Sequence, residues 1–212
     1  MRINRLAAAG ILLFALEARA QKPQVQVILP ERADLATEPP SVRSSALISD
    51  GAMRNLLVNG FPARLHYRME RWATGGFFDD IKAVGEWDVV VKYDALNKEY
   101  HVFRAVANRA VELGKTPTLG DAEDMVGAPF RAPITPAKKG QRTYYNVVLD
   151  IETLSLTELD EVEQWLRGEL KPAVRGKKNP GTAVSRGVRT LMVRLLGGEK
   201  RHYEARSGTF RP

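Results

Sequence analysis

Three stretches of this chain alternate apolar and polar residues with a period of two, and this pattern constrains the fold more than any other feature of the sequence. The stretches are residues 61–72 (FPARLHYRMERW), 87–106 (WDVVVKYDALNKEYHVFRAV) and 143–153 (TYYNVVLDIET). Successive side chains of a β-strand point to opposite faces, so such alternation is typical of strands that bury one face. Residues 94–97 supply a turn within the second stretch, which is therefore predicted to form a β-hairpin.

The same alternation predicts which side chains form the core. In the first stretch the residues expected to share one face are Phe61, Ala63, Leu65, Tyr67 and Met69; in the other two the inward residues are Trp87, Val89, Val91, Tyr93, Tyr145, Val147, Leu149 and Ile151. The opposite face carries mainly charged residues, as a solvated sheet surface does.

Shorter signals place the remaining elements. Further strands are expected at residues 24–29, 41–48 and 202–206. Asp50 is a good N-cap for a helix of about two turns that stops at Gly60, and Thr118 caps a second short helix over residues 119–126. Two further helices are predicted at residues 157–172 and 182–196, although residues 189–195 also fit a strand.

Two regions are expected to lack regular structure. Residues 73–84 contain Gly75 and Gly76 and are predicted to form a loop. Residues 129–140 contain three prolines, which remove backbone donors and oppose both helices and central strands.

Together these elements predict a mainly β (α+β) fold, an antiparallel β-sandwich or sheet with two or three helices, the longer ones C-terminal. The expected organisation is a signal peptide at residues 1–20, an extended leader at 21–40, and a single β-rich domain at 41–212 with a basic C-terminal helical segment. The roughly 190 residues that follow the signal peptide are enough for one domain with its own core.

The first twenty residues have the order of a secretory signal peptide. Arg2 and Arg5 precede an apolar run over residues 6–16, and the small residues Ala18 and Ala20 then match a signal peptidase site. The run is shorter than the roughly 20 residues that span a bilayer. Cleavage after Ala20 and export to a bacterial periplasm are therefore expected, with an uncleaved membrane anchor as the alternative. The chain has no cysteine, so disulfides and thiol catalysis are excluded.

Positive charge is concentrated near the C-terminus. Residues 21–166 contain 17 Lys/Arg and 21 Asp/Glu, a net charge of −4, whereas residues 167–212 contain 12 Lys/Arg and 3 Asp/Glu, a net charge of +9. The candidate anionic-ligand-binding residues are Arg175, Lys177, Lys178, Arg186 and Arg189. Behind a signal peptide the expected partner is an anionic membrane surface, through phospholipid or glycolipid head groups, or an envelope protein, and not a nucleic acid. A solvated basic face without a ligand is the alternative.

No group of residues identifies a reaction. The three histidines, His66, His101 and His202, are far apart in the sequence and do not indicate a metal site. Asp79 and Asp80 lack the ligand spacing of a calcium loop. Glu70 and Asp88 are expected to pair with arginines of neighbouring strands, and the aromatic residues Trp72, Trp87, Tyr93 and Tyr100 to belong to the core rather than to a sugar-stacking platform. No catalytic residue, metal or cofactor is predicted.

Two motifs resemble a known family. Residues 56–62 read LLxNGFP, residues 93–102 read YDxLxxEYxV, and the stretch at 143–154 then leads into a predicted helix. Over residues 41–165 the chain is similar to the bacterial exported family called domain of unknown function 4390. This resemblance implies an exported, β-rich protein of Gram-negative bacteria and transfers no catalytic residue.

The resulting interpretation is an exported, non-enzymatic accessory or binding domain of the cell envelope, whose basic C-terminal quarter contacts anionic lipid or glycolipid. A periplasmic accessory that docks to a membrane sensor or signalling protein is a second hypothesis. A hydrolase of an envelope polymer is a third, and it would require carboxylates or histidines that converge in a cleft.

Overall fold

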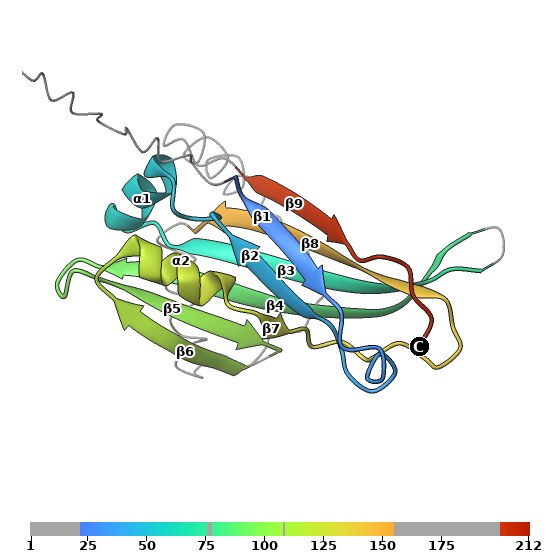
Figure 1. The fold of residues 1–212 in the computed structure, drawn as a ribbon. Helices are drawn as coiled ribbons and strands as arrows, with labels where there is room; N and C mark the ends of the chain where they lie inside the picture. The colour runs from blue at the N-terminus through green and yellow to red at the C-terminus, as the bar shows by residue number, and fades with distance from the viewer. Residues whose placement is uncertain (1–21, 76–77, 108, 155–199) are drawn as a thin grey trace, which may run out of the picture.

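The computed structural model describes residues 22–75, 78–107, 109–154 and 200–212, which form two antiparallel sheets and two helices (Figure 1). The elements are β1 (Gln24–Ile28), β2 (Ser41–Ser45), α1 (Gly51–Val58), β3 (Ala63–Ala73), β4 (Asp80–Asp94), β5 (Glu99–Val106), β6 (Arg109–Thr116), α2 (Leu119–Gly127), β7 (Phe130–Arg131), β8 (Thr143–Thr153) and β9 (Arg201–Arg206). The larger sheet has the strand order β6-β5-β4-β3-β8-β9 and the smaller one the order β1-β2-β7.

The predicted mainly β, α+β fold is confirmed. The smaller sheet lies across one face of the larger sheet, and the two helices lie at one end (Figure 1). Between the sheets, the ring of Trp87 on β4 stacks on Tyr67 of β3 at a centroid distance of 4.9 Å and packs against Phe130 of β7 at 5.5 Å. Burial of such large apolar surfaces between two layers is what makes a sandwich stable.

The inward side chains of the larger sheet are those that alternation predicts. Leu65 and Met69 of β3, Val91 of β4, and Val147 and Leu149 of β8 have no solvent-exposed surface. β3 is central, pairing with β4 on one side and with β8 on the other along its whole length. Since the side-chain period of a strand is two, this pairing places all of these residues on the same face.

Both short helices begin and end at the expected residues. The Asp50 carboxylate accepts hydrogen bonds from the amides of Ala52 and Met53 at 3.1 Å. At the other end of α1, Gly60 has a φ of 86°, and its amide donates to Leu57 O. This left-handed residue completes a helix cap that glycine adopts at little cost. In α2, Thr118 Oγ1 accepts the amide of Asp121 at 3.1 Å.

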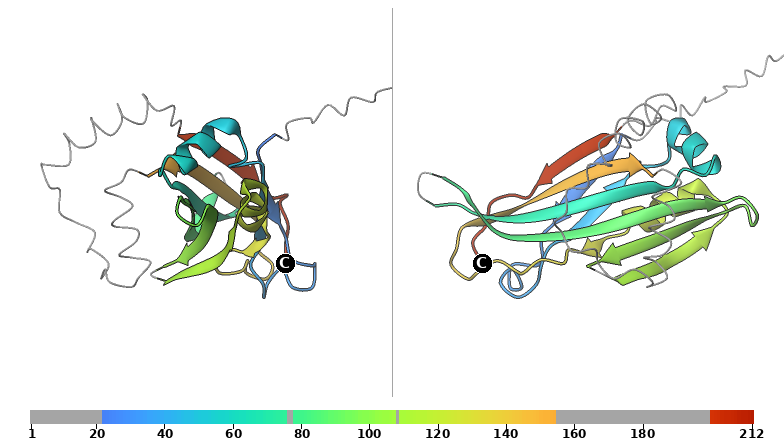
Figure 2. Two further views of the ribbon diagram at one scale, coloured as in Figure 1. Left: turned by 90° about the vertical axis from the view of Figure 1, so that its left-hand side faces the viewer. Right: turned by 180° about the vertical axis from the view of Figure 1, so that it is seen from behind.

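Two loop predictions are wrong. The expected loop at 73–84 is shorter, because β4 already begins at Asp80 and pairs with Ala73, the last residue of β3. This end of the hairpin runs beyond the smaller sheet (Figure 2). Val84 pairs with Glu70 and Ile81 with Trp72 on the outer face of the larger sheet, where both apolar residues are exposed, so no alternation marks this part of the strand. The proline-rich stretch also contains β7, whose two residues pair with β2.

Strand β6 was not predicted. It pairs with β5 at the edge of the larger sheet, and the register shifts between Val102 and Phe103 of β5. The residue that the shift inserts, Leu113, breaks the period-two pattern that would reveal the strand. The two predicted C-terminal helices, at 157–172 and 182–196, lie outside the described residues.

Candidate functional site

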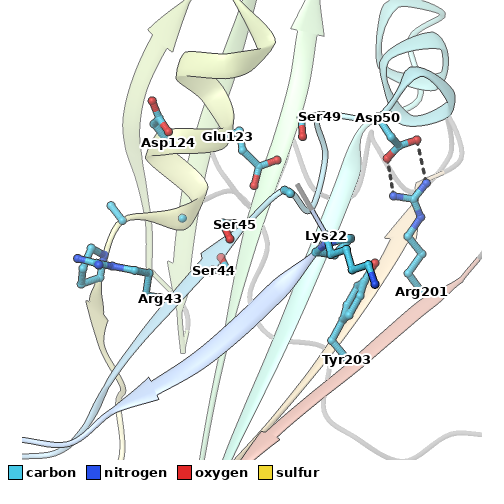
Figure 3. Close-up of a pocket in the computed structure, with 15 residues that line it drawn as sticks. Lys22, Arg43, Ser44, Ser45, Ser49, Asp50, Glu123, Asp124, Arg201 and Tyr203 are labelled. Carbon is cyan, nitrogen blue, oxygen red and sulfur yellow. Dashed lines mark hydrogen bonds and ion pairs between the residues drawn. The ribbon is translucent and has the colours of Figure 1, made fainter. Parts of the chain in front are cut away.

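A pocket of about 930 Å³ opens where β2, α2 and β9 meet (Figure 3). It lies on the inner side of the larger sheet, next to the start of α1. Its lining residues are Lys22, Pro23, Arg43, Ser44, Ser45, Ala46, Ser49, Asp50, Glu123, Asp124, Gly127, Ala128, Pro129, Arg201 and Tyr203. A volume of this size is typical of sites for small molecules.

One wall of the pocket depends on a tight contact between α2 and β2. A Cβ atom added to Gly127, the last residue of α2, would lie 2.3 Å from Ser44 O. Only glycine therefore allows the helix to approach the strand this closely. On the inner side of the same strand, the hydroxyl groups of Ser44 and Tyr67 are hydrogen-bonded at 3.2 Å. Burial raises the pKa of the Tyr67 hydroxyl to about 12, so this group is a neutral hydrogen-bonding partner.

The Glu123 carboxylate has a structural role in the pocket. It is buried, and its two oxygens accept the amides of Leu47 at 2.9 Å and of Ile48 at 2.7 Å. Ala46, which precedes them, adopts a left-handed conformation with a φ of 55°, and the two amides that follow this turn point to the same carboxylate. Consecutive amides after such a turn form an anion-binding concavity, and here the chain's own glutamate fills it.

A second carboxylate, that of Asp50, is also engaged. Arg201 donates to both of its oxygens, at 2.5 and 3.0 Å, while Asp50 caps α1 (Figure 3). The hydrogen bond from Arg201 lowers the pKa of Asp50 below its usual value. This bidentate pair ties the first residue of β9 to the start of α1.

The remaining charged groups of the pocket are Lys22, Arg43 and Asp124, all of them exposed. Within the described residues neither Lys22 nor Arg43 takes part in an ion pair. Figure 3 shows these two cations on either side of Ser44 and Ser45. The pocket therefore offers two cations without an ion pair among the described residues, several hydroxyl groups, two carboxylates that are already occupied, and the exposed carboxylate of Asp124.

The predicted basic residues Arg175, Lys177, Lys178, Arg186 and Arg189 all lie outside the described residues, so the structure does not place them. Arg201, which lines the pocket, comes twelve residues after Arg189 in the sequence. Sequence reasoning missed Lys22, Arg43 and Glu123, because these residues are separated by up to a hundred positions and no local pattern connects them.

Asp88 and Glu70 on the outer face pair with arginines, as predicted. Arg64 Nε donates to Asp88 at 2.9 Å, and Arg68 lies 3.0 Å from Glu70. His66 Nδ1 is 2.9 Å from the same Asp88, and this hydrogen bond raises the pKa of His66. Burial alone would raise the pKa of Asp88, but the hydrogen bonds from His66 and Arg64 outweigh it and lower the pKa.

Other candidates from the sequence have structural partners. Asp79 accepts a hydrogen bond from the Tyr144 hydroxyl at 3.2 Å, and Asp80 lies 3.2 Å from Lys82. Trp87 and Tyr100 are buried, as a core role requires. Arg104 does not pair with an outer-face carboxylate, because it points inward and lies 4.1 Å from the ring centroid of Phe130.

No protein-family model matches the chain, and neither a curated protein nor a solved structure is found to be similar to it. The resemblance to domain of unknown function 4390 therefore stays a prediction. In the part of the chain that the structure describes, no helix combines the length and the hydrophobicity needed to cross a bilayer.

Proposed function

We propose that this chain is an exported, non-enzymatic binding protein of the cell envelope, and that the pocket between β2, α2 and β9 receives an anionic lipid or glycolipid head group. The observation that carries the proposal is that two carboxylates of the pocket already have hydrogen-bond partners, whereas its two exposed cations have no ion pair among the described residues. The carboxylates of Glu123 and Asp50 are engaged in structural hydrogen bonds, whereas Lys22 and Arg43 have no ion-pair partner among the described residues. A phosphate would find two cations there, together with the Ser45, Ser49 and Tyr203 hydroxyl groups as donors.

Along the sequence, positive charge is close to two residues that line this pocket. Cleavage after Ala20 would leave an α-amino group one residue before Lys22, and the basic segment with Arg175 to Arg189 comes twelve residues before Arg201. A membrane carrying anionic lipids attracts basic residues near its surface by about 1 kcal/mol each. The segment is thus suited to bring the pocket to the membrane.

The occupied carboxylates also favour binding over hydrolysis. General acid–base catalysis needs a group that can gain or lose a proton beside the substrate. Glu123 is buried on two amides, and Asp50 is held by Arg201 and by the first turn of α1. Both carboxylates thus hold the fold together, which leaves the exposed Asp124 as the remaining carboxylate of the pocket.

The test is sedimentation of the chain, purified from the periplasm of an expressing bacterium, with vesicles. One set contains phosphatidylglycerol in phosphatidylcholine, and the other contains phosphatidylcholine alone. We expect binding only to the anionic vesicles, and weaker binding as salt rises, since exposed charges are screened over about 8 Å at physiological ionic strength. Mass spectrometry of the same preparation reports whether Gln21 is the first residue.

Two variants separate the pocket from the basic segment. Lys22→Gln with Arg43→Gln removes the pocket cations, and the change of Arg175, Lys177, Lys178, Arg186 and Arg189 to Gln removes the segment's charge. Both should reduce binding. The matched control is Lys138→Gln with Lys139→Gln, two exposed cations beside the chain's C-terminal residue, and it should bind normally. Equal loss in the control would mean that net charge alone drives binding, and no binding by the wild type would reject the proposal.

A second function, docking to a membrane sensor or signalling protein, is favoured by the far end of the β3–β4 hairpin. Phe78 there is 85% exposed, and Ile81 and Val84 are 43% and 45% exposed. A photo-crosslinking amino acid at position 78 should capture an envelope protein in living cells. The same group at Leu96, which is 94% exposed at the opposite end of β4, is the control. Capture of the same proteins from both positions would argue against docking at the hairpin.

A further inference from the structure

Side chains of the β4–β5 turn and of β6 gather around one imidazole on the outer face of the larger sheet. Asp94 pairs with Glu99 across the turn, and His101 lies two residues farther along β5 on the same face. Their ligand atoms all lie within 4.8 Å of one another. Glu112 of β6 approaches the same ring from the other side.

Both nitrogens of the His101 ring face carboxylate oxygens. Nε2 is 3.0 Å from Glu99 Oε1 and 3.9 Å from Asp94 Oδ2, and Nδ1 is 3.3 Å from Glu112 Oε1. A neutral imidazole carries one N–H, so it can donate to one side only. In one tautomer Nε2 donates to Glu99. In the other, Nδ1 donates toward Glu112, the lone pair of Nε2 points at Glu99 and Asp94, and no described residue donates a hydrogen bond to Nε2. The side chain of His101 is only 10% exposed, so bulk water has little access to Nε2 and does not readily supply the missing hydrogen bond.

A cation bound at Nε2 would accept the lone pair of this nitrogen and would also attract the carboxylates of Glu99 and Asp94. We infer that His101, Glu99 and Asp94 form a site for a divalent transition metal ion of the zinc class, with Glu112 as the carboxylate that orients the imidazole. A histidine that binds a metal commonly donates its other N–H to a carboxylate, which fixes the ring and its tautomer. Glu112 stands where this second partner is required.

The spacing and the type of the donors favour zinc over calcium or magnesium. Metal–ligand bonds of 2.0–2.2 Å in a tetrahedral site place neighbouring donor atoms about 3.3 Å apart. The two measured separations from Nε2, 3.0 and 3.9 Å, bracket that value. One nitrogen and two oxygens form the three-ligand set of an open zinc site, whereas calcium takes six to eight oxygens.

Lys115 is the group that competes with a metal at this place. Its Nζ lies 4.0 Å from Glu99 Oε1 and 3.9 Å from Glu112 Oε1. A nearby ammonium repels a divalent cation and draws on the same carboxylates. Removing this charge should therefore strengthen metal binding, an effect that a purely structural ion-pair cluster does not predict.

The site is independent of the pocket proposal, and its test uses the whole untagged chain freed of metal by a chelator. Titration with ZnCl₂ in a calorimeter should show one ion bound per chain, and MgCl₂ should show none. His101→Gln should abolish the binding. His66→Gln is the matched control, because His66 also lies in an ion-paired cluster on the same face, and it should bind as the wild type does. Circular dichroism verifies that both variants are folded.

Two further variants test the assigned roles without removing a ligand. Glu112→Gln should weaken zinc binding by about 10- to 100-fold, as loss of an orienting carboxylate does. Lys115→Met should strengthen it. Cobalt(II) in place of zinc should give the visible absorption of a four-coordinate ion in the wild type and lose it in His101→Gln. The inference is overturned if the wild type shows no saturable zinc binding, or if His101→Gln binds as tightly as His66→Gln.

Discussion

The two faces of the six-stranded sheet are stabilised in different ways. The inner face is apolar, and Leu65, Val91 and Leu149 on its three central strands have no exposed surface. The outer face of the same strands is a network of charges, in which Arg64 lies 2.9 Å from Asp88 and 3.3 Å from Glu152. Apolar burial is non-directional and depends on area, whereas an ion pair on a wet surface contributes little and depends on geometry. Burial on the inner face should therefore supply most of the stability. The ion pairs of the outer face should add little stability and mainly fix the local arrangement of their side chains.

The sharpest test of the role of apolar burial compares the same substitution at a buried and at an exposed position of the sheet. Val91→Asp buries a charge without a partner at a fully buried position, so it should cost more than about 4 kcal/mol and can prevent folding. Val111→Asp, at a position that is 62% exposed on β6, should change stability by less than about 0.5 kcal/mol. Urea denaturation of both variants measures the difference. Equal midpoints would show that β4 does not bury the face assigned here.

Glu123 is a buried carboxylate on the inner side of the sheet, and its two oxygens accept hydrogen bonds from two backbone amides. Glu123→Ala leaves the buried amides of Leu47 and Ile48 without acceptors, which should cost about 2–6 kcal/mol at about 1–3 kcal/mol for each amide. Asp124→Ala, at the exposed neighbouring position of α2, is the control and should be nearly neutral. Thermal unfolding compares the two. A similar melting temperature for both variants would mean that the amides find other partners.

On the outer face, loss of a charge should matter much less. Asp88→Asn removes the partner shared by Arg64 and His66, whose side chains are 36% and 32% exposed. We expect a loss of about 1 kcal/mol that becomes smaller at high salt, because partly exposed ion pairs are screened. Urea melts at low and high salt provide the measurement. A loss as large as that of Val91→Asp would contradict the assignment of stability to the inner face.

The smallest predicted effect is the pH dependence of the same cluster. His66 has a raised pKa, so its contribution is fully present below its unfolded pKa and is lost as pH rises through the folded pKa. Asp88 has a lowered pKa, so its contribution is present above its unfolded pKa and is lost as pH falls. The stability difference between wild type and Asp88→Asn should therefore be largest between roughly pH 4 and pH 6.5. A difference that keeps growing above this range would refute the role of His66.

Strands that bury one face were predictable, and so were the edge strands β1 and β9, whereas β6 and β7 were not. β3, β4 near Val91, and β8 were found because core packing imposes a period of two on their residues. β6 was missed because Leu113 is inserted at an irregularity, and β7 because its two residues lie among prolines. Edge strands bury less surface, so fewer of their residues are constrained to a pattern.

The candidate sites were harder to predict than the fold. The basic quarter was visible as a run of charges, but Lys22, Arg43 and Arg201 come from opposite ends of the sequence. Asp94, Glu99 and His101 are near one another in the sequence, yet their separations of two to seven positions do not match a familiar metal motif. The turn that brings Asp94 opposite Glu99, and the edge strand that brings Glu112 to the ring, make the cluster.

The sequence by itself determined the mainly β fold, the inward residues of the central strands, the Asp50 and Thr118 helix caps, and the concentration of positive charge near the C-terminus. These are properties of periodicity and local hydrogen bonding, which act over a few residues. Only the tertiary structure decided that Glu123 is bound by the amides of Leu47 and Ile48, that Asp50 pairs with Arg201, and that His101 lies among three carboxylates. Such contacts depend on how strands and helices distant in the sequence are brought together, and burial of apolar surface, not the polar residues themselves, supplies most of the free energy for that assembly.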